Sequence, residues 1–155
     1  AAPGAIHVRT DVERKVMAGV AEGERLPEEG YTAAASSEVY AACLARAEAA
    51  LRAGHSVVLD AVFAREGERQ AAEELARRTK AHFAGIWLDA PHQVLTARVA
   101  ARRCDASDAT PGVVAKQLTF ETGAIGWSRV DAAGTEAETL ARVRERLPFR
   151  SAAPA

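Results

Sequence analysis

Acidic side chains follow the four short apolar runs of this sequence. Asp11, Asp60, Asp89 and Asp131 each fall at or just after the end of such a run. If these runs form strands of an open parallel sheet, ligands bind beyond their carboxyl ends. One acid in this place is as often a turn former or helix cap. Four of them together favour a ligand site at this edge of the sheet.

Asp11 and Arg14 are three residues apart at the start of an expected helix, so their side chains share one face. The carboxylate can accept a hydroxyl proton while the guanidinium holds the molecule that carries the hydroxyl. A simpler role is also open, in which Asp11 favours the positive end of the helix and Arg14 is a solvated charge. Spacing alone favours this simpler role.

Asp60 directly follows the run Val57-Val58-Leu59. An acid at the end of a buried strand is the pattern of a Walker-B residue, which orients a magnesium ion through water. Many buried strands end in Asp without a metal, so the pattern by itself is a weak indication.

Three arginines, Arg98, Arg102 and Arg103, lie close together near the end of one expected helix. The loop that follows contains Asp105 and Asp108. Arginines on a mobile lid can neutralise the charge of a phosphoryl group during its transfer. The alternative, of equal weight, is that cations simply stabilise the negative end of the helix.

The sequence contains no Gly-Lys dipeptide, so the phosphate-binding loop G-x-x-x-x-G-K-[ST] is missing from it. The glycines of 123–126 precede an expected strand where that loop requires a helix. The histidines and the two cysteines form no metal-ligand pattern, and no Ser-His-Asp arrangement is evident.

Strands and helices are expected to alternate along the chain. Strands are expected at 6–9, 56–60, 83–88 and 127–130. Helices are expected from Thr10, from Thr32, over 65–79, from Pro91, from Thr110 and from Thr135. Capping boxes are predicted at Thr10-x-x-Glu13 and Thr135-x-x-Glu138. This alternation predicts an α/β domain with a parallel sheet covered on both faces.

Composition indicates one globular domain. The chain has 155 residues, of which 48% are hydrophobic and 26% charged. No apolar run approaches the roughly 20 residues of a membrane helix, and no signal peptide is evident, so a soluble cytoplasmic protein without a membrane partner is expected. The net charge of −1 argues against bulk binding of nucleic acid. The domain is expected to span 1–147, followed by a disordered tail at 148–155.

Five segments in this order resemble the P-loop kinases. They are Val8–Lys15, Ala53–Ala61, Trp87–Pro91, Arg98–Arg103 and Asp105–Ala109. The branch they resemble includes gluconate kinase, zeta-toxin-like and polynucleotide kinase domains. The sequence is most similar to the ATP-binding domain that is fused behind an aminoglycoside-phosphotransferase-like domain in bacteria. The resemblance covers about 6–147.

The resemblance implies a catalytic role for five residues. Asp11 and Arg14 would position and activate the hydroxyl of a small-molecule acceptor. Asp60 would lie near the magnesium ion and the acceptor, while Arg102 and Arg103 would belong to the lid. ATP and Mg²⁺ are the implied cofactors.

Three further residues are implied to bind the nucleotide. Arg98 is a lid arginine, and Asp131 and Gly134 would lie near the purine. The fold implied is a three-layer P-loop NTPase-like domain that is N-terminally incomplete, because the first strand, the P-loop and the first helix of the family should precede Ala1.

Three functional readings follow. The first is an ATP-dependent small-molecule kinase that is inactive as this fragment. The second is a non-catalytic nucleotide-binding or regulatory remnant of a fused protein, and the third is an unrelated flavodoxin-like module. Without the family's first strand, the strands ending at Asp60 and Asp89 are predicted either to pair directly or to leave edges through which the chain self-associates.

Overall fold

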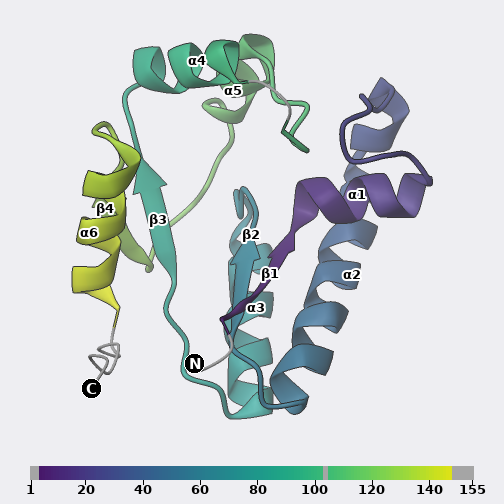
Figure 1. Cartoon of the computed structure of the whole chain (residues 1–155), viewed down its shortest axis with the longest axis vertical. Helices are drawn as coiled ribbons and strands as arrows, with labels where there is room; N and C mark the ends of the chain where they lie inside the picture. Colours follow the sequence, from purple (N-terminus) through teal and green to yellow (C-terminus); the bar gives the residue numbers. More distant parts are fainter. Residues whose placement is uncertain (1–3, 103–104, 148–155) are drawn as a thin grey trace.

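Strands and helices alternate in the computed structural model, which describes residues 4–102 and 105–147 (Figure 1). The predicted tail at 148–155 lies outside the described residues. The strands are β1 (Ile6–Arg9), β2 (Val57–Asp60), β3 (Ile86–Asp89) and β4 (Ser128–Asp131). The helices are α1 (Thr10–Ala18), α2 (Ala33–Arg52), α3 (Glu66–Thr79), α4 (His92–Ala101), α5 (Pro111–Gln117) and α6 (Glu136–Arg146), with a short 3₁₀ helix η1 (Glu28–Tyr31).

Threonine side chains begin three of the helices, as predicted. The hydroxyl of Thr32 accepts a hydrogen bond at the start of α2, and that of Thr110 does the same for α5, whose first residue is Pro111. At α6, Thr135 and Glu138 form the predicted capping box. Each cap satisfies backbone N–H groups that have no partner inside the helix.

The capping box predicted at Thr10 and Glu13 is wrong. The N-cap of α1 is Arg9, and no side chain caps this helix end. Thr10 Oγ1 instead donates to the backbone carbonyl of Asp60 at 3.4 Å. The Glu13 carboxylate accepts a hydrogen bond from Arg46 of α2 at 2.5 Å. Contacts with other elements therefore draw both side chains away from the helix end.

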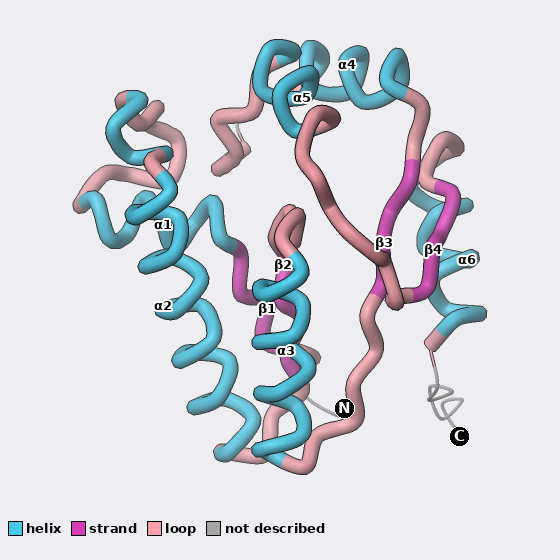
Figure 2. Tube along the Cα trace, turned by 180° about the vertical axis from the view of Figure 1, so that it is seen from behind, coloured by secondary structure: helices cyan, strands magenta, loops and turns pink. Residues whose placement is uncertain are grey.

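The strands form two separate parallel pairs. β1 pairs with β2, with Val8 opposite Leu59, and β3 pairs with β4, with Leu88 opposite Val130. No ladder of hydrogen bonds joins β2 to β3 in the described residues. Figure 2 shows the two pairs as separate units. The predicted direct pairing of the strands that end at Asp60 and Asp89 is therefore wrong, and self-association stays a prediction.

Helix α2 covers one face of the β1–β2 pair. Val57 and Leu59 of β2 pack against a cluster of Val8, Val39 and Cys43. Because side chains alternate along a strand, the residue between them, at position 58, points to the opposite face. That side chain is 51% exposed.

The β3–β4 pair has a similar uncovered position. The Arg69 guanidinium of α3 lies 5.8 Å from the ring centroid of Trp87. Leu88, the residue after Trp87 in β3, points to the other face and is 57% exposed, although Val130 beside it is buried. Val58 and Leu88 are thus apolar strand residues that remain exposed on the face away from α2 and α3.

A chain of aromatic rings connects the two pairs of strands. Tyr40 contacts Phe63, Phe63 contacts Trp127, and Trp127 contacts Phe83, all edge to face at 5.0–5.7 Å between centroids. Phe63 follows β2, Phe83 precedes β3 and Trp127 precedes β4. The Trp127 indole also donates to Glu73 of α3 at 2.8 Å. Edge-to-face contacts of this kind stabilise the fold beyond the contribution from burying the rings.

Arg69 makes a second connection between the pairs. Its guanidinium is buried and donates to the backbone carbonyls of Phe63 and Ala64 after β2. It also donates to the carbonyls of Thr122 and Ala124 before β4. The planar fork of arginine can satisfy several acceptors at once, so one side chain holds two distant loops together.

Candidate functional site

Two acids, Asp60 and Asp105, contact Arg9 at the end of β1. Its Nη2 atom donates to Asp105 Oδ1 at 2.8 Å, and its Nε atom lies 3.3 Å from Asp60 Oδ2. The hydrogen bond to Asp105 raises the pKa of Arg9, and the charges of Asp60 and Asp11 add to that effect. The structure therefore brings Asp60 and Asp105 together around Arg9, an arginine that sequence reasoning missed, and Asp11 follows Arg9 by two residues.

Asp60 is suited to hold a hydrated magnesium ion. Its side chain is half exposed, and its Oδ2 atom lies 3.2 Å from His7 Nε2. Within residues 4–102 and 105–147 no group of three or more His, Cys, Asp or Glu side chains forms a metal cage. Magnesium does not require one, because it commonly uses one or two carboxylates together with water and substrate phosphates.

Arg14 is held by the loop between α1 and α2. Its Nη1 atom donates to the carbonyl of Gly30 at 2.8 Å, and its guanidinium lies 5.0 Å from the ring centroid of Tyr31. Its Nε atom is buried without a hydrogen-bond partner among the described residues. These contacts hold the guanidinium near the loop. The simpler hypothesis, in which Arg14 is a solvated charge, does not predict such contacts.

Asp108 joins this loop from far along the chain. Its carboxylate accepts hydrogen bonds from the Leu26 N–H, from the Tyr31 hydroxyl and from Lys15 Nζ. Lys15 is 2% exposed and also donates to the carbonyl of Glu22. Sequence reasoning placed Asp108 in a lid loop but gave no role to Lys15 or Tyr31. A lysine on an amphipathic helix gives no sign in the sequence that it is buried.

The predicted lid arginines separate in the structure. Arg98 donates to the carbonyls of Ala132 and Gly134 after β4, at 2.6 Å for the first. The Arg102 Nε atom lies 3.6 Å from Asp105 Oδ2, and its side chain is more than a third exposed. Arg103 lies outside the described residues. Arg102 therefore faces the Arg9 cluster, whereas Arg98 holds the loop between β4 and α6.

The residues predicted near the purine gather at the end of β4. Asp131 Oδ1 accepts the N–H of Ala133 at 2.8 Å, and its Oδ2 lies 3.4 Å from Arg142 Nη1. Gly134 follows and binds Arg98 through its carbonyl. Arg98, Asp131 and Gly134 thus form a second group, on the β3–β4 pair, distinct from the group around Arg9.

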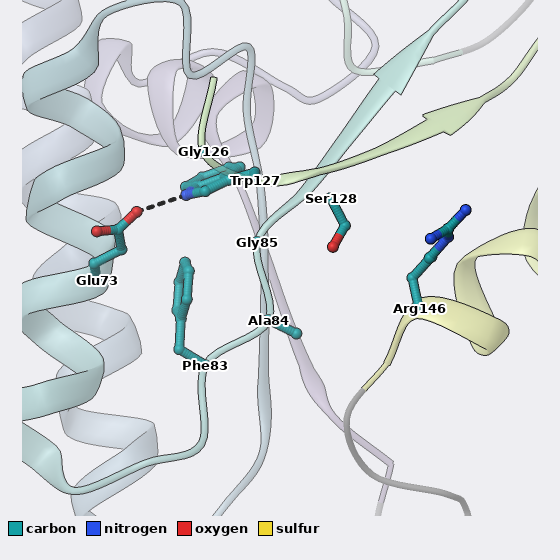
Figure 3. Close-up of a pocket in the computed structure, with 8 residues that line it drawn as sticks. All are labelled: Glu73, Phe83, Ala84, Gly85, Gly126, Trp127, Ser128 and Arg146. Atoms are coloured by element: carbon teal, nitrogen blue, oxygen red, sulfur yellow. Dashed lines mark hydrogen bonds between the residues drawn. The ribbon is translucent and has the colours of Figure 1, made fainter. Parts of the chain in front are cut away.

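Two hollows lie beside the two pairs of strands. One, of about 340 Å³, lies at the beginning of β3 and β4 (Figure 3). It is lined by Glu73, Phe83, Ala84, Gly85, Gly126, Trp127, Ser128 and Arg146. The other, of about 450 Å³, lies between β1 and α2. Neither has Asp11 or Asp60 in its lining, but Arg9 and His7 line the second hollow, which therefore reaches the group around Arg9.

Parallel strands with charged residues beyond their carboxyl ends are the arrangement of nucleotide-binding α/β domains. The family profile of an AAA domain matches residues 1–121. The chain therefore belongs to this AAA domain family, which is P-loop NTPase-like and of the kinase type. A search of curated proteins and of solved structures gave no significant match. Of the described helices, none has the length and apolar character needed to cross a membrane.

Proposed function

We propose that this chain is the acceptor-binding part of an ATP-dependent small-molecule kinase, which moves the γ-phosphate of ATP to a hydroxyl. The observation that carries the proposal is the contact of Arg9, at the end of β1, with Asp60 at the end of β2 and with Asp105, which Arg102 also faces. Membership in a kinase-type NTPase family supports it.

Four residues, Asp11, Arg14, Asp60 and Arg102, have a part in the proposed reaction. Asp11 accepts the proton of the acceptor hydroxyl as the oxygen attacks phosphorus. Arg14, held beside Tyr31, orients the acceptor. Asp60 holds a magnesium ion through water, and such an ion, when bound, offsets the negative charge of the phosphates. Arg102 stabilises the charge that develops on the transferring group.

The phosphates of ATP need a binding loop, and this sequence does not contain the G-x-x-x-x-G-K-[ST] loop that serves this purpose. We propose that a strand, loop and helix outside this sequence supply it, with the strand between β2 and β3. Two observations support this: β2 and β3 are not paired with each other, and both strands have an exposed apolar residue, Val58 and Leu88. A central strand would pair with both edges, and its helix would cover those side chains.

The test compares the complete gene product with residues 1–155 alone. ATP consumption and ³¹P spectra are recorded with sugar acids, sugars, nucleosides and aminoglycosides, one class at a time. The proposal expects a phosphorylated product with the complete protein and none with residues 1–155. Absence of product with the complete protein, at ATP concentrations that saturate binding, contradicts it.

A non-catalytic nucleotide-binding role is the alternative, and one observation favours it. Arg98, Asp60 and Asp131 are all engaged with groups of the chain itself. Residues held this way can serve the fold alone. Under this alternative the complete protein binds an ATP analogue but leaves ATP unconverted with every class of acceptor.

A further inference from the structure

One carboxylate, Asp108, accepts hydrogen bonds from two donors in a loop about 80 residues earlier in the sequence and from one donor in α1. Its Oδ2 atom accepts from the Leu26 N–H at 3.0 Å and from the Tyr31 hydroxyl at 2.5 Å. Its Oδ1 atom lies 3.2 Å from Lys15 Nζ, at the end of α1. The Asp108 side chain is 12% exposed and that of Lys15 is 2% exposed. The contact with Lys15 is therefore largely shielded from solvent, whereas Tyr31 is 43% exposed.

The loop fixed in this way, residues 19–31, also touches the residue expected to hold the acceptor. Tyr31 lies under the Arg14 guanidinium, and Gly30 accepts a hydrogen bond from it. A path of direct contacts thus runs from Asp108 through Tyr31 to Arg14. Hydrogen bonds to an ionised carboxylate are shorter and stronger than those between neutral groups, so this path is a strong constraint on the loop.

We propose that Asp108 is a positioning residue that sets the shape of the 19–31 loop and, through Tyr31, the place of Arg14. It would thereby determine which acceptor the enzyme takes. The part concerning the acceptor rests on the proposed function, whereas the part concerning the loop does not.

Charge supports this role. Burial alone would raise the pKa of Asp108, but the hydrogen bonds from Leu26, Tyr31 and Lys15 hold that pKa below its ordinary value. Asp108 is therefore a carboxylate at neutral pH, with two oxygens that only accept hydrogen bonds. If the carboxylate is removed, the buried Lys15 ammonium loses its counter-ion and the Leu26 N–H loses its acceptor.

The loop is tested by hydrogen exchange in the complete protein, with the variants Asp108→Ala, Asp108→Asn and Tyr31→Phe. The control is Glu145→Gln, an exposed acid-to-amide change on α6. We expect amide exchange in peptides of 22–31 to rise about tenfold in Asp108→Ala, because one lost hydrogen bond is worth roughly a factor of ten. Tyr31→Phe should show a smaller rise, and the control none.

Peptides of α3 report whether each variant is folded. Should Asp108→Ala unfold, Asp108→Asn and Tyr31→Phe each remove only part of the network and take its place. Equal protection of 22–31 in all variants overturns the proposal, as does an increase of the same size in every peptide of the protein.

The role of Asp108 in acceptor binding is tested by enzyme kinetics. The acceptor is a compound of the four classes that the unaltered protein phosphorylates. Asp108→Ala should raise KM for that compound at least about tenfold, while KM for ATP remains within twofold. An equal rise in both KM values overturns the acceptor role. If the unaltered protein phosphorylates none of the compounds, the proposed function and the acceptor role fail together, and hydrogen exchange still decides whether Asp108 positions the loop.

Discussion

The Arg69 guanidinium donates a 2.5 Å hydrogen bond to the backbone carbonyl of Thr122, 53 residues further along the chain. With its bonds to Phe63 and Ala64, it joins the loop after β2 to the loop before β4. The two pairs of strands share no ladder, so this side chain carries a connection that backbone pairing would otherwise provide.

Replacing Arg69 should therefore destabilise the fold. Arg69→Ala leaves buried carbonyls without donors, and we expect the free energy of unfolding to fall by about 3 kcal/mol. Arg69→Lys should rescue little, because an ammonium lacks the planar fork that reaches several acceptors. The control is Arg77→Ala on the same helix, whose side chain is 71% exposed. Urea unfolding of the complete protein measures all three, and equal stability of Arg69→Ala and Arg77→Ala would contradict the connection.

Close packing of Trp127 on the backbone at Gly85 gives a second prediction. A Cβ atom at position 85 would overlap the Trp127 ring. Gly85→Ala should lower the free energy of unfolding by about 1–3 kcal/mol, since the ring must shift. The matched control is Gly67→Ala in α3, where nothing lies within 4 Å of an added Cβ. That change should be neutral or stabilising by up to about 1 kcal/mol, and a loss of the same size at both positions would rule out the clash.

Local signals in the sequence predicted most of the elements. Threonine caps, Pro111 and alternating apolar residues placed the strands and helices close to their observed bounds. The buried stripe of α2 differs by one residue, at three of its four positions, from the stripe that the sequence predicts. The apolar spacing after Thr32 predicts that Tyr40, Leu44, Ala47 and Leu51 face the core, whereas the structure buries Val39, Cys43, Ala47 and Ala50. Two neighbouring rows of apolar side chains on a helix have the same spacing. Only packing against the strands determines which of the two rows is buried.

The candidate site was also predictable only in part, because some of its contacts depend on tertiary structure. Acids at strand ends are visible in a sequence, so Asp11 and Asp60 were found. Arg9 lies beside Asp60 because β1 pairs with β2, and Asp105, 96 residues away, folds back onto it. Contacts of this length depend on tertiary structure, and neither periodicity nor spacing encodes them.

The proposed catalytic role of Asp11 makes a third prediction, for the complete protein. Asp11→Asn keeps the shape of the side chain but removes the base, so kcat should fall by about 10²–10⁴-fold. The affinity for ATP should stay nearly unchanged. Glu145→Gln, an exposed acid-to-amide change on α6, is the control. An unimpaired kcat in Asp11→Asn removes Asp11 from the mechanism.

Arg102 gives a fourth prediction, because it faces the group around Arg9 and remains partly exposed. Arg102→Ala should lower kcat by about 10²-fold or more if the guanidinium stabilises the transferring phosphoryl group. The free energy of unfolding should change by no more than about 0.5 kcal/mol, as for other surface positions. Arg144→Ala on α6, also exposed, should change neither. A loss of folded protein that matches the loss of activity would show that Arg102 serves the fold.

The contact between Arg9 and Asp105 should make stability depend on pH. The hydrogen bond from Arg9, followed by the one from the Ser107 N–H, holds the pKa of Asp105 below its ordinary value of 3.8. A carboxyl whose pKa is lower in the folded state than in the unfolded state stabilises the fold above the unfolded pKa. That contribution is lost as the pH falls from about 3.8 through the folded pKa.

Asp105→Asn removes this titration. At about pH 7 the variant should be less stable than the unaltered protein by about 1–2 kcal/mol, the range for a partly exposed hydrogen bond to a charged group. The difference should shrink as the pH falls below about 3.8, because the unaltered protein then loses the same interaction. Urea unfolding at a series of pH values measures it, with Glu145→Gln as the control for a general effect of charge. A difference that stays constant from neutral pH down to the acid limit would show that Asp105 stabilises the fold through its shape and not through its charge.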